Sequence, residues 1–406
     1  MKKTFVFMLA VVLLLSVLIG CGSTTAEDIA NQDQEQAEAS GLTIHKIGVA
    51  TYNVADPQVR MFKNYLDDYI KECFPNVTFL YSESLTGSED MMAFLETCAE
   101  NGAEGIMLLT SYDLPKEVEL CAEKGMYVIR PAATSSDADF EAVASNPYFV
   151  GEIGPGADNE YNDAAAMTRD LAAEGKQYLI LSGGASMGNE MHRLRTVAML
   201  DVLQQTYGVR FEQTSEELAL VEQPTAIQVG FLKLILCPGY VSNETSRAAM
   251  EEAIRSGDYT TVLSTIPVTQ FMDQLKSMEM EAGVMDFFSE ENYFGFKDGT
   301  IAYVAGKYQS EIGPGFAALF NAILGEGDLY RVDGKAFRLE QGFWSAADEA
   351  EYDSKYALAC SATINAYNYE DLYSIIKSMN PEASFEDFRE LTESYSYEDC
   401  LARRSD

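Results

Sequence analysis

Short apolar runs alternate with helical patterns along the first third of the chain. Ile44–Tyr52 and Gly105–Leu109 are short, mainly apolar runs, which are typical of strands buried on both faces. Apolar residues recur at helical spacing over Val59–Cys73 and Leu114–Lys124, and Gly125 closes the second of these helices. The alternation predicts a parallel sheet covered on both faces. The same reasoning adds strands at Val77–Tyr81 and Met126–Ile129 and a helix at Met91–Ala99.

The alternation restarts at Tyr148 and continues to about residue 325. Gly154, Pro155 and Gly156 break the pattern directly after the first strand of this second series. We therefore predict two α/β lobes that follow one another, each with its own sheet. The predicted strands are Tyr148–Ile153, Gln177–Ser182, Phe231–Leu236, Thr261–Ser264 and Gly283–Phe287, and the predicted helices are Tyr161–Ala173, Glu190–Gln205, Ala248–Arg255, Gln270–Glu279 and Gly315–Leu324.

From about residue 330 the pattern changes to one strand followed by helices. Phe337–Phe343 is strand-like, and the helical stretches after it are Ala346–Ala362, Tyr369–Ser378 and Phe385–Ser394. Ser384 is suited to cap the last of these helices, because acidic residues fill the first turn. We predict a helical C-terminal extension, residues 341–406, that packs against the lobes.

The first residues have the pattern of an export signal. Lys2 and Lys3 precede an apolar run, Phe5–Gly20, that is shorter than the roughly 20 residues of a spanning helix. The run ends Leu-Ile-Gly-Cys, which resembles a bacterial lipoprotein signal. That resemblance implies a signal peptide at 1–20, cleavage before Cys21 and a lipid on Cys21. Residues 21–41 read as a flexible linker, so the folded part would be anchored to a membrane by lipid only, on its extracellular or periplasmic side.

Composition limits the partners and cofactors. The 406 residues carry a formal net charge of −36, which repels nucleic acid and anionic lipid headgroups. Only two histidines are present, so a histidine-based zinc site is not expected, and we predict no metal and no cofactor. Apart from Cys21 the cysteines are scattered, which argues against a dense disulfide framework but leaves one or two bridges open.

The order of elements resembles the ribose- and galactose-type substrate-binding proteins of bacterial ABC transporters, which have the type I periplasmic-binding-protein fold. The matching stretches are IGVATYNVADPQV, AEGIMLLTSYDLPKEVELCAEKGMYVI, YFVGEIGPGADN, YLILSGGASMGNEMHRLRTVAML and GKYQSEIGPGFAALFNAILG, and together they cover roughly residues 44 to 325. The resemblance implies two Rossmann-like lobes joined by a hinge of three chain crossings. Lobe 1 would comprise 42–150 and about 308–340, and lobe 2 would comprise 151–307.

The resemblance also implies a ligand site between the lobes, at the carboxyl ends of the strands. A sugar needs Asp, Asn and Arg for its hydroxyls and an aromatic ring for its apolar face. Gln58 and Val59 stand where the family often has aromatic residues, so we expect Tyr52 or Tyr112 to take that role. The predicted ligand-binding residues are Tyr52, Asp56, Thr110, Tyr112, Asp113, Arg130, Arg193, Thr265, Asp286 and Lys307.

Some of these assignments have an alternative. Asp113 could instead cap the next helix, and Lys307, where the family commonly has Gln, could form a salt bridge across the lobes. If Lys307 faces the ligand, a sugar acid or another anionic derivative would fit. Of the two arginines of the match, we expect Arg193 to reach the ligand and Arg195 to be structural.

The predicted function is capture of a sugar or sugar-like ligand and its delivery to an ABC permease by a monomeric binding protein without enzyme activity. A ligand-sensing receptor for a membrane histidine kinase or chemoreceptor is the alternative. Gly184–Gly188 matches G-x-S-x-G, the motif of serine hydrolases, but the only downstream histidine, His192, lies on the very next helix turn, which does not fit the triad of that family. The export signal and the acidic charge argue against the transcription repressors that share this fold.

Overall fold

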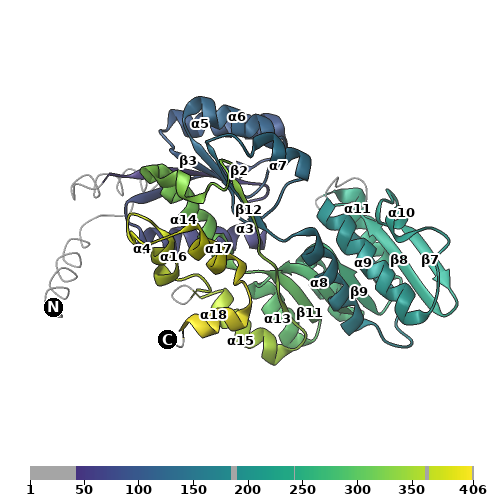
Figure 1. Ribbon diagram of the computed structural model, residues 1–406. Coiled ribbons are helices and arrows are strands. Elements are labelled where there is room, and N and C mark those ends of the chain that lie inside the picture. Colours follow the sequence, from purple (N-terminus) through teal and green to yellow (C-terminus); the bar gives the residue numbers. More distant parts are fainter. Residues whose placement is uncertain (1–42, 184–189, 242, 362–364, 405–406) are drawn as a thin grey trace, which may run out of the picture. The chain divides into compact units, whose positions relative to one another are not determined.

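Two mainly parallel sheets follow one another along the chain, as the alternating pattern predicts (Figure 1). The computed structural model describes residues 43–183, 190–241, 243–361 and 365–404. The first sheet has six strands in the order β12-β5-β4-β3-β1-β2, and they pair in parallel. Its strands are β1 (His45–Thr51), β2 (Val77–Ser84), β3 (Gly105–Leu108), β4 (Tyr127–Arg130), β5 (Phe149–Gly154) and β12 (Phe337–Glu340).

The second sheet has seven strands in the order β13-β11-β10-β9-β6-β8-β7. Its inner strands pair in parallel, whereas the two edge strands, β7 and β13, are antiparallel to their neighbours. Its strands are β6 (Tyr178–Ser182), β7 (Thr225–Val229), β8 (Leu232–Pro238), β9 (Thr261–Ser264), β10 (Glu281–Phe287), β11 (Ile301–Lys307) and β13 (Trp344–Ala346).

The helices before the C-terminal extension fall into two groups, one for each sheet, and each sheet with its helices is called a lobe. Lobe 1 is the first sheet with α3 (Pro57–Asn64), η1 (Tyr65–Ile70), α4 (Lys71–Cys73), α5 (Ser88–Glu100), α6 (Leu114–Lys124), α7 (Asp137–Val143), η4 (Gln309–Ile312), α14 (Gly313–Asn321), η5 (Ala322–Glu326) and η6 (Gly327–Tyr330). Lobe 2 is the second sheet with α8 (Ala157–Leu171), α9 (Glu190–Tyr207), α10 (Ser215–Ala219), α11 (Glu244–Arg255), η3 (Thr269–Phe271), α12 (Met272–Ser277) and α13 (Glu290–Asp298). The chain crosses between the sheets after β5, after β11 and after β12, so the three predicted crossings are present.

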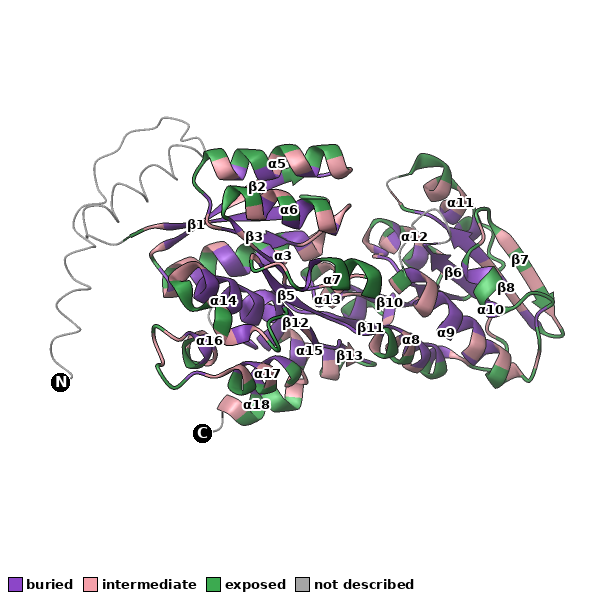
Figure 2. Cartoon of the chain, turned by 45° about the horizontal axis from the view of Figure 1, so that its top comes forward, coloured by how far each residue is buried: buried purple, intermediate pink, exposed green. Residues whose placement is uncertain are grey.

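Strand side chains alternate between two packed faces, which explains the apolar runs. On β1, Ile47 and Val49 join the core cluster that contains Phe62 of α3, whereas Ala50 joins the cluster that contains Met91 of α5. Figure 2 shows the strands as mainly buried and the outer faces of α5 and α6 as exposed. Both faces of the sheet are therefore covered, as the sequence pattern predicts.

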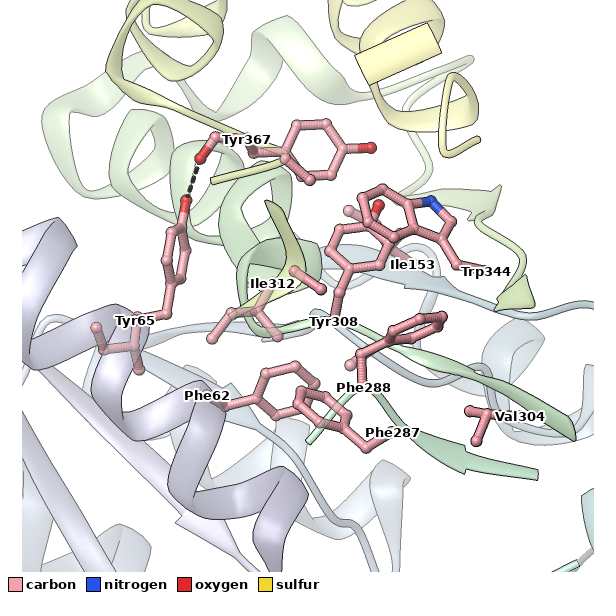
Figure 3. Packing of buried hydrophobic residues seen from close by; sticks show 14 of the residues in the cluster. Phe62, Tyr65, Ile153, Phe287, Phe288, Val304, Tyr308, Ile312, Trp344 and Tyr367 are labelled. Carbon is pink, nitrogen blue, oxygen red and sulfur yellow. Dashed lines mark hydrogen bonds between the residues drawn. The ribbon is translucent and has the colours of Figure 1, made fainter. Parts of the chain in front are cut away.

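The C-terminal extension packs on both lobes. It contains α15 (Glu349–Ala359), α16 (Tyr369–Ile375), α17 (Phe385–Glu393) and α18 (Tyr397–Arg404). On the lobe 2 side, Tyr352 of α15 stacks on Phe296 of α13, with ring centroids 4.6 Å apart. On the lobe 1 side, the Tyr65 hydroxyl donates to the Tyr367 carbonyl oxygen over 2.9 Å (Figure 3). The extension is therefore continuous with the core of the molecule.

Several predicted boundaries need correction. Helix α6 has the predicted limits because Asp113 caps its start and Gly125 ends it in the left-handed conformation. Phe231 was expected to begin a strand, but it lies outside β8 and is 99% exposed. The pattern missed β11, whose Ala and Gly residues weaken the apolar signal, and β13, which has three residues. It also missed β7 and the helices α7, α10, α13 and α18.

Candidate functional site

The predicted site residues stand at the carboxyl ends of strands in both sheets. In lobe 1, Tyr52 follows β1, Thr110 and Tyr112 follow β3, and Arg130 ends β4. In lobe 2, Thr265 follows β9, Asp286 is the penultimate residue of β10, and Lys307 ends β11. Parallel strands of one sheet all end at the same side, so each sheet brings its own site residues together there. In α/β folds, ligands bind at this side of the sheet.

Residues of the two lobes meet in what we call the Tyr–Asp cluster: Tyr52, Asp56, Tyr112, Tyr240 and Asp286. Burial, together with the nearby carboxylates of Asp56 and Asp286, raises the pKa of Tyr52 well above its usual value, and the Tyr52 hydroxyl is hydrogen-bonded to Asp56. Tyr240, which follows β8, adds to the rise in the pKa of Tyr52. Burial and, to a smaller extent, Tyr112 raise the pKa of Tyr240 itself. Lobe 1 thus contributes three members of the cluster and lobe 2 contributes two.

The two carboxylates of the Tyr–Asp cluster are held by neutral donors. Asp56 caps α3 and accepts from the Gln58 backbone N–H over 2.9 Å. Asp286 accepts from the Asn292 side-chain amide over 2.8 Å. Burial raises the pKa of Asp286 to about 7, and the Asp56 charge adds to this rise, whereas the Asn292 hydrogen bond opposes it. Burial also raises the pKa of Asp56. The pair therefore favours a proton or another positive charge.

Charged side chains next to the Tyr–Asp cluster form a second group, the buried ion network. Its first pair is Arg195 of α9 and Glu160 of α8, whose Nε and Oε2 atoms are 2.5 Å apart and whose side chains are buried. Arg195 also donates to the Thr265 carbonyl oxygen over 3.2 Å. Its positive charge opposes the rise in the pKa of Asp286 that burial causes.

Lys307 and Glu311 are two further buried charges of the network, and each acts on the pKa of the other. The Lys307 ammonium donates to the Ala132 carbonyl oxygen, and the negative charge of Glu311 acts on it. Burial raises the pKa of Glu311 to about 8, and both of its carboxylate oxygens lack a hydrogen-bond partner among the described residues. The charge that acts on Lys307 thus comes from the second crossing segment, directly after β11, and its carbonyl partner comes from the loop after β4.

Arg130 completes the network at the end of β4. Its Nη1 atom lies 3.7 Å from Oε2 of Glu152, which also binds Arg338 over 2.6 Å. Burial lowers the pKa of Arg130. Its Nε atom is buried and has no hydrogen-bond partner within the described part of the chain.

Two predicted site residues are engaged elsewhere. Arg193 forms ion pairs with Glu190 and Glu216 on the surface of lobe 2. Arg195, which was expected to be structural, forms the buried ion pair with Glu160. Asp113 caps α6 and pairs with Lys116. Because the side chains at positions 193 and 195 of a helix point about 200° apart, only one of them can face the strand ends.

Sequence reasoning missed Tyr240 and Asn292. Tyr240 lies in the turn after β8, which follows the residues Pro238 and Gly239, and it is 47% exposed. Its position after a strand was a signal that could have identified it, as it identified Tyr112. Asn292 lies in the first turn of α13, a helix that the pattern did not predict. Thr265, which was predicted, is buried and bonded through its hydroxyl to His192 over 3.0 Å.

Some predicted features lie outside the described residues, and the remaining cysteines lie within them. Cys21, the export signal and the G-x-S-x-G stretch, Gly184–Gly188, lie outside them. Cys73, Cys98, Cys121, Cys237, Cys360 and Cys400 are all free. Over residues 43–404, leaving out the undescribed gaps, no group of acidic, Cys and His side chains is arranged to hold a metal ion. Within the same ranges, none of the helices combines the length and apolar character needed to span a membrane.

Comparison with known proteins identifies the fold. No protein-family model and no curated protein matches the chain. Solved structures do match, among them a substrate-binding protein of a sugar ABC transport system from Bordetella parapertussis, with 15% identity and a TM-score of 0.54 over 79% of this chain and 94% of that one. The arabinose ABC transporter binding protein of Shewanella sp. ANA-3 has 9% identity and a TM-score of 0.54, with 77% and 94% coverage.

A third match shows that the fold by itself does not decide the function. A protein described as a LacI transcriptional regulator from Bacteroides fragilis has 12% identity and a TM-score of 0.51, with 77% of this chain and 99% of that chain covered. Repressors and binding proteins thus share the two-lobe architecture. Together with the two parallel sheets and the three crossings, these likenesses show that the chain has the type I periplasmic-binding-protein fold.

Proposed function

We propose that this chain is an extracytoplasmic binding lipoprotein that captures a sugar or sugar-like ligand between its lobes and delivers it to an ABC permease. The observation that carries the proposal is the Tyr–Asp cluster. It places acceptor carboxylates and tyrosine rings from both lobes at the carboxyl ends of their strands. Carboxylates accept from sugar hydroxyls, and aromatic rings cover the apolar face of a sugar.

A ligand bound at this position would contact both lobes at once. Asp56 belongs to lobe 1 and Asp286 to lobe 2, so a ligand that bridges them favours a closed arrangement over an open one. In this proposal, the lobes close about the three crossings when the ligand binds, and the closed form is what the permease recognises. No catalytic role is assigned to any residue, because hydrogen-bond acceptors and donors around a ligand suffice for capture.

The membrane attachment rests on the N-terminal pattern. Cleavage before Cys21 and its lipidation would leave residues 21–41 as a tether for the folded part, outside the cytoplasm. The permease would meet the closed form of a monomer. A receptor that presents the closed form to a sensor kinase or chemoreceptor is the alternative role of the same site. The net charge of −36 argues against the DNA-binding role of repressors with this fold.

A thermal-shift screen tests ligand capture. The mature chain, without residues 1–22, is heated with sugars, polyols, sugar acids, amino sugars and amino acids. A ligand at about 100 times its dissociation constant adds roughly 2.7 kcal/mol to the free energy of unfolding, which raises the melting temperature measurably. We expect a hit within one class of polyhydroxylated compounds. Stabilisation by amino acids alone, with no sugar or polyol effective, would contradict the proposal.

A second experiment tests the anchor. Cells that express the full chain or a Cys21→Ala variant are fed a labelled fatty acid and then fractionated. We expect the label and membrane association for the parent and neither for the variant. Equal membrane association of both forms would reject lipid anchoring through Cys21.

A further inference from the structure

The C-terminal extension holds lobe 2 through α15. Tyr352 of α15 is fully buried, and its hydroxyl accepts from the Ser289 backbone N–H and donates to the Ser289 carbonyl oxygen, each over 3.1 Å. Ser289 is the residue that caps the start of α13. Near the end of α13, Lys297 forms ion pairs with Glu349 and Asp353 of α15 over 2.7 and 2.8 Å. Helix α15 is therefore fixed to lobe 2 at both ends of α13.

The next helix of the extension, α16, holds lobe 1. At its start, the Tyr369 backbone N–H donates to the Tyr69 hydroxyl of η1 over 2.8 Å. At its end, the buried side chain of Asn321, the last residue of α14, donates to the Ile375 carbonyl oxygen over 3.0 Å and accepts from the Lys377 backbone N–H over 2.8 Å. Helix α16 is thus fixed to lobe 1 along its length.

Between these two attachments the extension binds the segments that join the lobes. In the second crossing, residues 308–312, the Gln309 side chain donates to the Asn365 side-chain oxygen over 2.6 Å. The Ser310 hydroxyl accepts from the Tyr367 backbone N–H over 3.1 Å. In the third crossing, residues 341–343, the Gln341 side chain donates to the Tyr367 hydroxyl over 2.9 Å. All five residues are buried, so a hydrogen bond broken here leaves a polar group without water.

The crossings also pack tightly against the extension and against each other. A methyl group added at Gly342 would lie 2.6 Å from the Tyr395 ring, so the third crossing touches the extension directly. The Trp344 indole N–H donates to the Tyr395 carbonyl oxygen. Figure 3 shows Tyr308 of the second crossing stacked on Trp344, with ring centroids 4.1 Å apart. Two of the three crossings and the extension therefore form one packed unit.

We propose that the extension is a brace across the hinge, which restrains the motion of the two lobes and sets their resting arrangement. The hinge brace consists of α15, α16 and the residues Asn365 and Tyr367 between them. Because it holds lobe 2, lobe 1 and two crossings at once, a rotation of one lobe against the other changes its contacts on at least one side. Hinge motion therefore has to overcome the brace as well as bend the crossings. The inference goes beyond ligand capture and holds for any ligand.

The test weakens the brace where it meets lobe 2 and keeps the extension in place. The brace variant combines Tyr352→Phe, which removes both hydrogen bonds to Ser289, with Lys297→Glu, which turns two attractions to α15 into repulsions. Truncation is not used, because the extension belongs to the core. If the double variant does not fold, Lys297→Glu alone, which changes partly exposed charges, takes the same test.

A matched control changes the same residue types within lobe 2. It combines Tyr178→Phe with Lys276→Glu. The Tyr178 hydroxyl is bonded to the Tyr207 hydroxyl over 2.7 Å, and Lys276 pairs with Asp298 over 2.8 Å, so neither substitution touches the brace. Tyr178 is fully buried, as Tyr352 is.

Two measurements on the mature chain without ligand report on the hinge. Small-angle X-ray scattering gives the spread of lobe arrangements, and hydrogen exchange gives the local opening of the crossings. We expect the folded brace variant to have a wider distance distribution and at least about fivefold faster exchange in residues 308–312 and 341–343. The control should match the parent in both measurements.

Three results would overturn the brace. In the first, α15 exchanges faster but the scattering and the exchange of both crossings stay as in the parent. In the second, exchange rises equally throughout the chain, including β3 and β4, which indicates a general loss of stability. In the third, the control has the same effect as the brace variant. Each of these results leaves the capture function to the thermal-shift screen, because no ligand enters this test.

Discussion

Arg193 and Arg195 show how two neighbouring residues of one type acquire different roles. Arg193 is held by surface carboxylates, whereas Arg195 forms a buried ion pair with Glu160 next to the Tyr–Asp cluster. A buried charge that loses its partner costs several kcal/mol, but an exposed pair contributes about 1 kcal/mol or less. The two positions are thus distinguished by burial and not by residue type.

Substitution of each arginine by glutamine should reveal this difference. We expect Arg195→Gln to lower the free energy of unfolding by about 3–5 kcal/mol, because Glu160 is left buried without a partner. Arg193→Gln should change it by about 1 kcal/mol or less. Urea denaturation of the two variants and the parent gives the comparison. Similar losses of unfolding free energy in both variants would contradict a buried role for Arg195 and a surface role for Arg193.

Asp286 predicts a pH dependence. Its pKa in the folded chain is raised to about 7, so its contribution to stability is full below its ordinary pKa and is lost as the pH rises toward 7. Relative to Asp286→Asn, the parent should therefore lose about 2 kcal/mol of stability between about pH 4 and pH 7, less than the whole pKa difference implies because the side chain is partly exposed. Thermal melts of both proteins across this range measure the effect, and parallel curves would contradict it.

At the scale of elements, local signals located most of the helices and the inner strands other than β11. The predicted limits of α6 agree with the structure because Asp113 and Gly125 define both ends. Strand β9 has its predicted limits, Thr261–Ser264, because the run is apolar on both faces and buried. The two antiparallel edge strands, β7 and β13, were missed, since they gain their place by pairing with β8 and β11. Strand pairing joins segments that are far apart in the sequence, so it cannot be predicted from a local periodicity.

The contact between α16 and lobe 1 can be tested at one hydroxyl. The buried Tyr65 of η1 donates to the Tyr367 carbonyl oxygen just before α16 (Figure 3). Tyr65→Phe leaves this buried acceptor without its donor, so we expect a loss of about 1–3 kcal/mol in chemical denaturation. Tyr373→Phe is the control, because Tyr373 is 42% exposed and should change stability by less than about 0.5 kcal/mol. Equal effects of the two variants would reject the contact.

At the scale of the whole molecule, one apolar core extends through both lobes and the C-terminal extension. Phe62 of lobe 1 packs edge-on against Phe287 of lobe 2 at 5.3 Å, and Trp344 stacks on Tyr308 at 4.1 Å (Figure 3). Tyr352 and Phe388 of the extension belong to the same core cluster. The extension is therefore part of the folding unit.

Removal of the extension should prevent folding. A chain that ends at residue 346 loses Tyr352, Tyr367 and Phe388 from the core. Burial of each such side chain is worth about 1.5–3 kcal/mol, so the loss exceeds about 5 kcal/mol, which is comparable with the whole stability of a domain. Circular dichroism and gel filtration should show an unfolded or aggregated chain. A chain that begins at residue 43 is the control and should fold, because the compact unit starts at His45. A folded, monomeric product ending at 346 would contradict the shared core.

The sequence by itself determined the alternation of strands and helices, the division into two lobes and the strand ends where chemistry gathers. These follow from local periodicity and from residue type, which the chain displays directly. Only the tertiary structure decided that Arg195 is buried against Glu160 whereas Arg193 pairs on the surface. It also decided that Asn292 holds Asp286 and that the Lys307 ammonium binds the Ala132 carbonyl oxygen. The reason is physical: burial and electrostatic pairing depend on which distant segments meet, and the sequence pattern gives no distances between them.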